Sequence, residues 1–176
     1  MKYKTELIAA MTWLGEQKDT VFIGQAVGVG GTFMSQTLEG VPLEKRTEWP
    51  VCESFQMQAS IGMALTGQTI ISIFPRQNFL LLALADLINT LDKLPNISNQ
   101  KLRPKVIIRT AKGPESPIYP GHQHVGHYAE AFQLMLDNIP VYELNNPSLI
   151  VPCYKAAYEW PGPVLMIEDG NLYEQN

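Results

Sequence analysis

The sequence of 176 residues lacks several features that would place it in a specialised class of protein. No apolar run approaches the length that crosses a membrane, so we expect no membrane partner. There is no basic cluster, and the formal net charge is −4, which argues against nucleic acid as a main partner. The two cysteines, Cys52 and Cys153, have no metal-ligand spacing and provide no disulfide framework. The first 18 residues lack the continuous apolar run of a signal peptide. Together these absences favour a cytoplasmic protein.

Short β-rich runs alternate with helical runs along the chain. Strands are predicted at 20–24, 47–52, 68–74, 104–110, 140–144 and 163–169. Helices are predicted near the start, from Glu53 onward, and over 78–94, 128–136 and about 147–158. Apolar strands that alternate with helices are typical of a mostly parallel sheet with helices on both faces. The sequence therefore predicts one three-layer α/β domain over residues 1–176.

The predicted helix at 78–94 has almost no polar face over its first three turns, from Phe79 to Ile88. A helix that is apolar all round is buried all round. In so small a domain the sheet covers one side of an outer helix, so we expect a second subunit to cover the other. A central core helix is the alternative.

Two loops contain residue types that often carry chemistry. Glycines at 28, 30 and 31 follow the strand at 20–24, but their spacing is not G-x-G-x-x-G and no P-loop Lys-Ser/Thr follows. This favours a mobile loop over a phosphate loop. All three histidines, His122, His124 and His127, lie within residues 120–127. An active-site histidine is the favoured interpretation, and a metal site or inert loop histidines are the alternatives.

Glu53 stands where a short extended stretch ends and a Met/Ala/Gly-rich helical run begins. Burying an unpaired carboxylate costs several kcal/mol. Glu53 is therefore expected at the surface, at the helix N-terminus as a favourable charge, or in a working site.

Glu53, Phe79 and His124, in this order and spacing, resemble the pyrimidine-binding domain of thiamin-diphosphate enzymes. The resemblance is strongest to the N-terminal half of the E1 β-subunit of 2-oxo acid dehydrogenases and extends more distantly to transketolase. The segment from Glu53 to Asn89 carries most of it. In this segment a Glu opens a Gly/Ala-rich helix, a strand runs from Gly67 to Phe74, and Asn78-Phe79 precedes a helix that contains Ile88-Asn89.

The resemblance implies a role for each candidate residue. Glu53 would hydrogen-bond the cofactor's aminopyrimidine ring and favour the imino tautomer that removes the thiazolium C2 proton. Phe79 would stack on that ring, His124 would contact the substrate, and Val51 would form an apolar wall. Gln25 falls where the E1 β-subunit carries a carboxylate beside the cofactor, which puts a proton relay at this position in doubt.

The resemblance also implies a missing half of the site. In this family the diphosphate and Mg²⁺ are held by Gly-Asp-Gly followed by an Asn, and Glu-Asp-Gly-Asn at 168–171 is not that motif. The expected function is a pyrimidine-binding subunit that works with a separate diphosphate-binding subunit, as a homodimer within a hetero-oligomer. The expected reaction is decarboxylation of a small 2-oxo acid, or aldehyde or ketol transfer. A non-catalytic structural or regulatory subunit and a histidine–metal hydrolase are the alternatives.

Overall fold

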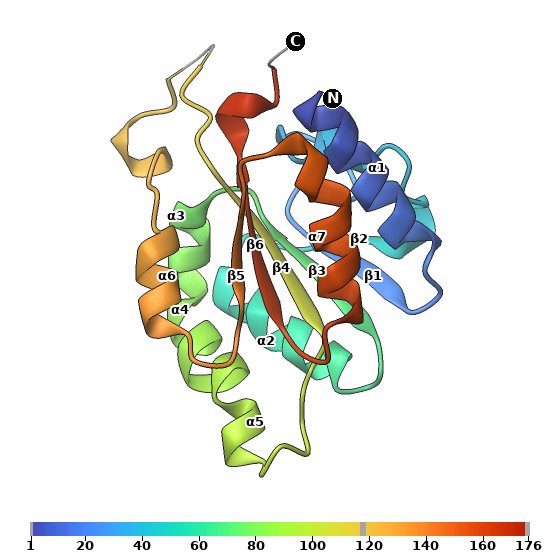
Figure 1. Cartoon of the computed structure of the whole chain (residues 1–176), viewed down its shortest axis with the longest axis vertical. Coiled ribbons are helices and arrows are strands. Elements are labelled where there is room, and N and C mark those ends of the chain that lie inside the picture. Colours follow the sequence, from blue (N-terminus) through green and yellow to red (C-terminus); the bar gives the residue numbers. More distant parts are fainter. Residues whose placement is uncertain (1, 117–118, 175–176) are drawn as a thin grey trace.

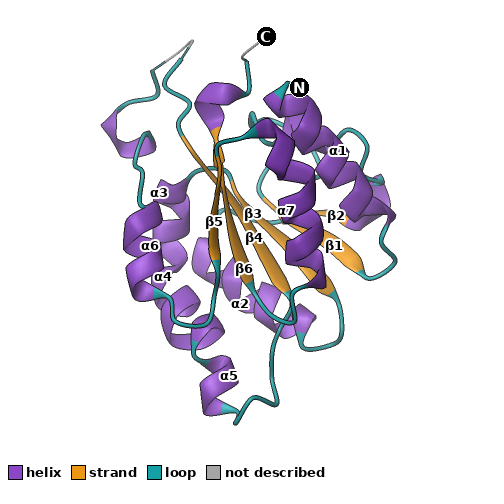
Figure 2. Ribbon diagram, viewed as in Figure 1, coloured by secondary structure: helices purple, strands orange, loops and turns teal. Residues whose placement is uncertain are grey.

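A computed structural model of the protein describes residues 2–116 and 119–174. Its centre is a six-stranded, wholly parallel sheet in the order β2-β1-β3-β4-β6-β5 (Figure 2). The strands are β1 (Thr20–Gly24), β2 (Arg46–Glu48), β3 (Thr69–Phe74), β4 (Val106–Lys112), β5 (Val141–Leu144) and β6 (Val164–Asp169). The predicted parallel α/β architecture is confirmed.

Helices cover both faces of the sheet and make three layers (Figure 1). One face carries α1 (Tyr3–Glu16) and α7 (Pro147–Glu159). The other carries α2 (Glu53–Ala64), α3 (Gln77–Leu80), α4 (Leu84–Asp86), α5 (Leu94–Ile97) and α6 (Ala129–Met135). The strands divide their side chains between the two layers: in β3, Ile71 and Ile73 join the core under α1 and α7, and Ile70 and Phe74 join the opposite core. This alternation explains why the central strands are apolar on both sides.

Two predicted elements differ from the structure, and a third agrees with it. The extended stretch at 47–52 is a strand only over Arg46–Glu48, because the chain turns away from the sheet before Pro50. The single helix expected at 78–94 is divided into α3, a 3-10 turn at Leu81–Ala83, α4, a π-helical segment at Leu87–Asp92, and α5. Its outer side is uncovered in the single chain, where Leu82 is 64% exposed. The helix expected at about 147–158 is the full-length α7, with 13 residues.

The strand order places a reversal between β1 and β3. These strands are neighbours, but the chain leaves β1 toward β2 on one side and leaves β3 toward β4 on the other. In open parallel sheets, the loops at such a point separate at the carboxyl ends of the strands and form the usual ligand crevice. The loop after β1, the start of α2 and the loop after β3 all lie at this edge.

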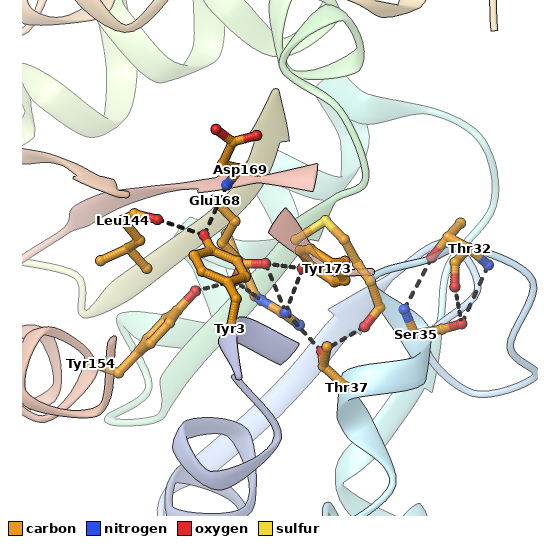
Figure 3. A network of polar contacts seen from close by, with 11 residues as sticks. Tyr3, Thr32, Ser35, Thr37, Leu144, Tyr154, Glu168, Asp169 and Tyr173 are labelled. Carbon is orange, nitrogen blue, oxygen red and sulfur yellow. Dashed lines mark hydrogen bonds and ion pairs between the residues drawn. The ribbon is translucent and has the colours of Figure 1, made fainter. Parts of the chain in front are cut away.

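A fully buried polar network ties the carboxyl half of the sheet to both ends of the described chain (Figure 3). The guanidinium of Arg109 on β4 makes a two-pronged ion pair with Glu168 on β6, at 2.5 Å from Nε and 2.9 Å from Nη2. The hydroxyls of Tyr154 and Tyr173 also donate to the Glu168 carboxylate. Burial raises the pKa of both tyrosines, and the adjacent Glu168 charge adds to the effect. The carboxylate thus receives four donors, which offsets the cost of burying it.

Within residues 2–116 and 119–174, the helices include none with the length and apolar character that a membrane span requires.

Candidate active site

Glu53 is the first residue of α2 and is only 6% exposed. Its Oε1 accepts a hydrogen bond from Nε2 of Gln25, the first residue after β1, at 3.2 Å. In the described ranges, neither an ion pair nor a second hydrogen bond to this carboxyl group is found. Glu53 is therefore buried at the N-terminus of a helix and is not a surface residue. One of its carboxyl oxygens has no hydrogen-bond partner among the described residues.

The loop after β1 is held by Glu48, the last residue of β2. The Glu48 carboxylate accepts from four successive backbone N–H groups, those of residues 26–29, at 2.6 to 3.4 Å. Such a backbone nest forms when a residue takes a left-handed conformation, and Ala26 has φ 55°. Gly24 precedes it because a Cβ there would lie 2.4 Å from the Ile73 carbonyl oxygen. The glycine-rich loop is therefore an anion nest, with Glu48 as its anion.

The rings of Phe79 and His124 contact each other at the carboxyl edge of the sheet. Their ring centroids are 5.5 Å apart at an interplanar angle of 55°, and both side chains are partly buried. Phe79 lies on α3, and His124 ends a 3-10 turn at His122–His124 in the loop that leads to α6. Nδ1 of His124 is buried and finds no hydrogen-bond partner among the described residues. An unpartnered buried nitrogen of this kind indicates a place for a polar ligand or water.

The other two histidines lie apart from this pair. His122 contacts the Tyr119 hydroxyl at 2.9 Å through Nδ1, and His127 contacts the Glu143 carboxylate at 2.9 Å through Nε2. In the part of the chain that the structure describes, no group of three or more His, Cys, Asp or Glu side chains is arranged to hold a metal ion.

The structure also brings in residues that the sequence did not single out. Arg76, just beyond β3, donates from Nη1 to the carbonyl oxygens of Gly113 at 2.5 Å and His124 at 2.9 Å. Asn78 accepts from the Gly126 N–H at 3.2 Å, and thus fixes the same loop from α3. The one available signal was the position of Arg76, a cation that closely follows a mostly apolar strand. Glu48 had no signal in the sequence, because its partners are backbone groups 19–22 residues away.

The sequence-predicted residues thus form two contacting pairs, Gln25 with Glu53 and Phe79 with His124. Both pairs lie on loops and helix starts at the carboxyl edge of the sheet. Val51 lies two residues before Glu53 and is 78% exposed in the single chain.

Comparisons with known proteins place the fold. Neither a family model nor a curated protein matches the sequence. Among solved structures, one described as a split-gene transketolase in an inactive β4 tetramer aligns with 96% of this chain and 51% of its own, at TM-score 0.71 and 16% identity. A second, described as a candidate thiamin diphosphate-dependent enzyme from Mycobacterium smegmatis, aligns with 96% of this chain and 31% of its own, at TM-score 0.65 and 13% identity. The chain therefore has the α/β fold found in transketolase-like thiamin diphosphate proteins, and spans about half or less of each.

Proposed function

We propose that this chain supplies the pyrimidine-binding half of a thiamin diphosphate enzyme whose diphosphate-binding half is a separate subunit. The observation that carries the proposal is the buried Glu53 carboxyl at the start of α2, held by Gln25 with its second oxygen unpartnered among the described residues. The fold supports it, because the similarity to the split-gene transketolase covers nearly the whole of this chain but half of that one.

The residues present fit the aminopyrimidine end of the cofactor. A carboxyl oxygen without a protein partner suits a ring nitrogen, and the partly exposed Phe79 ring suits a flat heterocycle. Nδ1 of His124 is buried and has no hydrogen-bond partner among the described residues, so it suits a polar atom of a ligand that lies beside Phe79. Among the described residues, the anion nest at residues 26–29 does not suit a diphosphate with Mg²⁺, because it is filled by Glu48. We therefore assign Mg²⁺ to the partner, which would carry the Gly-Asp-Gly and Asn motif.

When bound, thiamin diphosphate supplies a carbanion equivalent at C2 that attacks a carbonyl carbon. In this proposal the Glu53 side chain holds or shares a proton at Oε2, the oxygen that accepts no hydrogen bond from the described residues. Gln25 fixes the orientation of the carboxyl through Oε1. Phe79 orients the pyrimidine by stacking, and His124 contacts the reacting group from the loop before α6.

The proposed reaction is decarboxylation of a small 2-oxo acid, or transfer of the resulting aldehyde or ketol unit. The proposed assembly is a homodimer of this chain within a hetero-oligomer. A cytoplasmic setting fits the two free cysteines, of which Cys52 is exposed.

A second candidate is a non-catalytic subunit on the same fold. It is favoured by Gln25, which replaces the carboxylate expected at that position, and by the description of one structural neighbour as inactive. The retention of a buried Glu53 favours the enzyme.

Calorimetry on the chain alone tests the half-site proposal. Diphosphate and Mg²⁺ contacts are charge-assisted and supply most of the cofactor affinity. A hydrogen bond and a stacking contact are worth about 1–3 kcal/mol together, before the cost of immobilising a ligand. We therefore expect weak or undetectable binding of thiamin diphosphate with Mg²⁺ to the chain alone, and tight binding once the partner is added. Micromolar binding without a partner would contradict the proposal.

Hydrogen–deuterium exchange at C2 tests the role of Glu53 in the assembled complex. We expect Glu53→Gln to bind the cofactor but lose C2 exchange, because an amide cannot provide the carboxyl proton. Glu39→Gln, at an exposed position, is the matched control and should exchange normally. Normal exchange in the Glu53→Gln complex would remove Glu53 from the mechanism and favour the non-catalytic subunit.

A further inference from the structure

Arg76 is held in one orientation at the carboxyl edge of β3. Its Nη1 group donates both of its N–H bonds to backbone carbonyl oxygens, those of Gly113 and His124. Its guanidinium carbon lies 5.5 Å from the centroid of the Phe33 ring, within the range of a cation–π contact. Three separate segments of the chain therefore fix the plane of this side chain.

The charge of Arg76 has no anionic partner within the described part of the chain. No ion pair involves it, and burial lowers the pKa of the guanidinium. Arg109 on β4 shows the contrast, because the Glu168 carboxylate accepts hydrogen bonds from two of its nitrogens. Buried charges in proteins are normally paired, so a half-buried, unpaired cation at a ligand crevice indicates an anionic ligand.

The donors that remain on Arg76 have a specific shape. A guanidinium has five N–H bonds, and with both Nη1 bonds used, Nε and Nη2 keep three without a hydrogen-bond acceptor in residues 2–116 and 119–174. The Nε and Nη2 edge is a planar fork that matches two oxygens of a carboxylate or phosphate. Because the fork is already oriented, little side-chain entropy is lost when an oxyanion binds.

The position of Arg76 connects this fork to the candidate site. Arg76 follows β3, and Gln25 follows β1, so the two residues flank the reversal point of the sheet. Its bond to the His124 carbonyl also places it against the loop that carries the candidate histidine.

We propose that the Nε and Nη2 edge of Arg76 binds the anionic group of the substrate, a carboxylate or a phosphate ester. The assignment of that anion to a substrate rests on the proposed function, whereas the anion site itself does not. Arg76 is thus a specificity-determining residue that selects oxyanions over neutral carbonyl compounds.

Solution NMR of the full chain with ¹⁵N-labelled arginine tests the anion site directly. Pyruvate, acetate and inorganic phosphate are titrated separately, with pyruvamide as the uncharged control. We expect the Arg76 Nε–H signal to shift and saturate with a dissociation constant on the order of millimolar, as a charge-assisted pair open to water should. Arg46 is the internal control, because its Nε already donates to the Val41 carbonyl at 2.9 Å and should not respond.

Variants of Arg76 show whether anion binding needs the oriented Nε and Nη2 edge or only a positive charge at this position. Arg76→Lys keeps the charge without the fork, and we expect at least about tenfold weaker binding of the same anions. Arg76→Gln should abolish the saturable shift, detected on the neighbouring His124 ring signals, and Arg103→Gln, at an exposed position, should leave it intact. If Arg76→Gln fails to fold, the wild-type titration and Arg76→Lys still decide the outcome.

The outcomes distinguish a carboxylate from a phosphate ester. They also distinguish the anion site at Arg76 from the proposed thiamin diphosphate function. Tighter binding of pyruvate and acetate identifies a carboxylate, and tighter binding of phosphate identifies a phosphate ester. Linear, unsaturated shifts shared by all arginines, or equal shifts with pyruvamide, would overturn the anion site. Saturable binding at Arg76 together with failed C2 exchange in the wild-type complex would leave this site standing and overturn the cofactor proposal.

Discussion

At the scale of single residues, His124 has two separate functions. Its backbone carbonyl holds the loop before α6 in place, and its ring faces the candidate site. Its carbonyl oxygen accepts from Arg76, whereas its ring makes a tilted contact with Phe79 and leaves Nδ1 unpartnered in the described structure. The two functions are therefore separable by mutation, because removing the ring leaves the backbone bond in place.

We predict that His124→Ala lowers turnover of the assembled enzyme by about 10²-fold or more, because a side chain that contacts and positions the reacting group is lost. The loss of fold stability should stay below about 1 kcal/mol, since a partly buried loop side chain contributes little packing. Steady-state kinetics and urea unfolding give the two numbers. His122→Ala, on the same 3-10 turn, is the control. Unchanged turnover in His124→Ala would transfer the role to another histidine or remove it.

The candidate site was predictable from the sequence only in part. Glu53 was identified because a carboxylate between a strand and a helix is unusual, and the structure shows it buried. The contact of Gln25 with Glu53 and the orientation of Arg76 depend on loops that meet only after the sheet forms. A single charged residue at a strand end has no periodicity, so pattern analysis does not distinguish it from a solvated charge.

At the scale of elements, strands were easier to predict than the segment from 77 to 97. The central strands are short, apolar and bounded by turns, and each lies within two residues of its expected limits. The segment from 77 to 97 has helical composition throughout, yet it changes between α, 3-10 and π geometry. One reason is tertiary: the buried Asp92 accepts from the Asn138 N–H at 2.7 Å, which draws this turn toward the loop after α6. Such long-range bonds override local propensity.

The buried tyrosines around Glu168 predict a loss of stability at alkaline pH. The folded-state pKa of Tyr3, Tyr154 and Tyr173 is raised, first by burial and then by the Glu168 charge. In the unfolded chain tyrosine titrates at about 10. Their stabilising effect is therefore complete below pH of about 10 and falls as the pH rises further, because only the unfolded state then releases these protons.

Each such tyrosine should contribute a slope of about 1.4 kcal/mol per pH unit above that point. Tyr158 contributes as a fourth tyrosine, because its hydrogen bond to Asp19 raises its pKa to about 12. We predict that Tyr154→Phe makes the fall in unfolding free energy between pH 10 and 11 about a quarter shallower. Urea unfolding at half-unit pH intervals measures it. Tyr142→Phe, at an exposed position on β5, should leave the slope unchanged. An unchanged slope in Tyr154→Phe would show that the buried network is not the source of the alkaline loss.

At the scale of the whole molecule, part of the exposed apolar surface lies on α2 and on the 3-10 turn at Leu81–Ala83. Phe55 on α2 is 53% exposed, and Leu82 lies exposed in the 3-10 turn that packs beside α2. Val51, just before α2, adds to this surface. Large exposed side chains grouped on neighbouring elements are typical of subunit interfaces.

We predict that the chain forms a dimer or larger assembly through this surface at micromolar concentration. Leu82→Asp should shift it toward monomer, because a charge would be buried without a partner. Leu134→Asp, on the exposed side of α6, is the matched control and should leave the assembly intact. Multi-angle light scattering distinguishes the states, and a monomeric wild-type chain would contradict the prediction.

The bond between Glu48 and the loop after β1 bears on how the protein responds to dissolved phosphate. A carboxylate tethered by the fold is present at its nest at a high effective concentration, in the millimolar range or above. Free phosphate at physiological levels competes poorly against such a ligand, and an incoming anion would also have to displace four backbone bonds. The anion nest of the glycine-rich loop is thus already occupied by the Glu48 carboxylate. We therefore expect the conformation of this loop not to change with the concentration of dissolved phosphate.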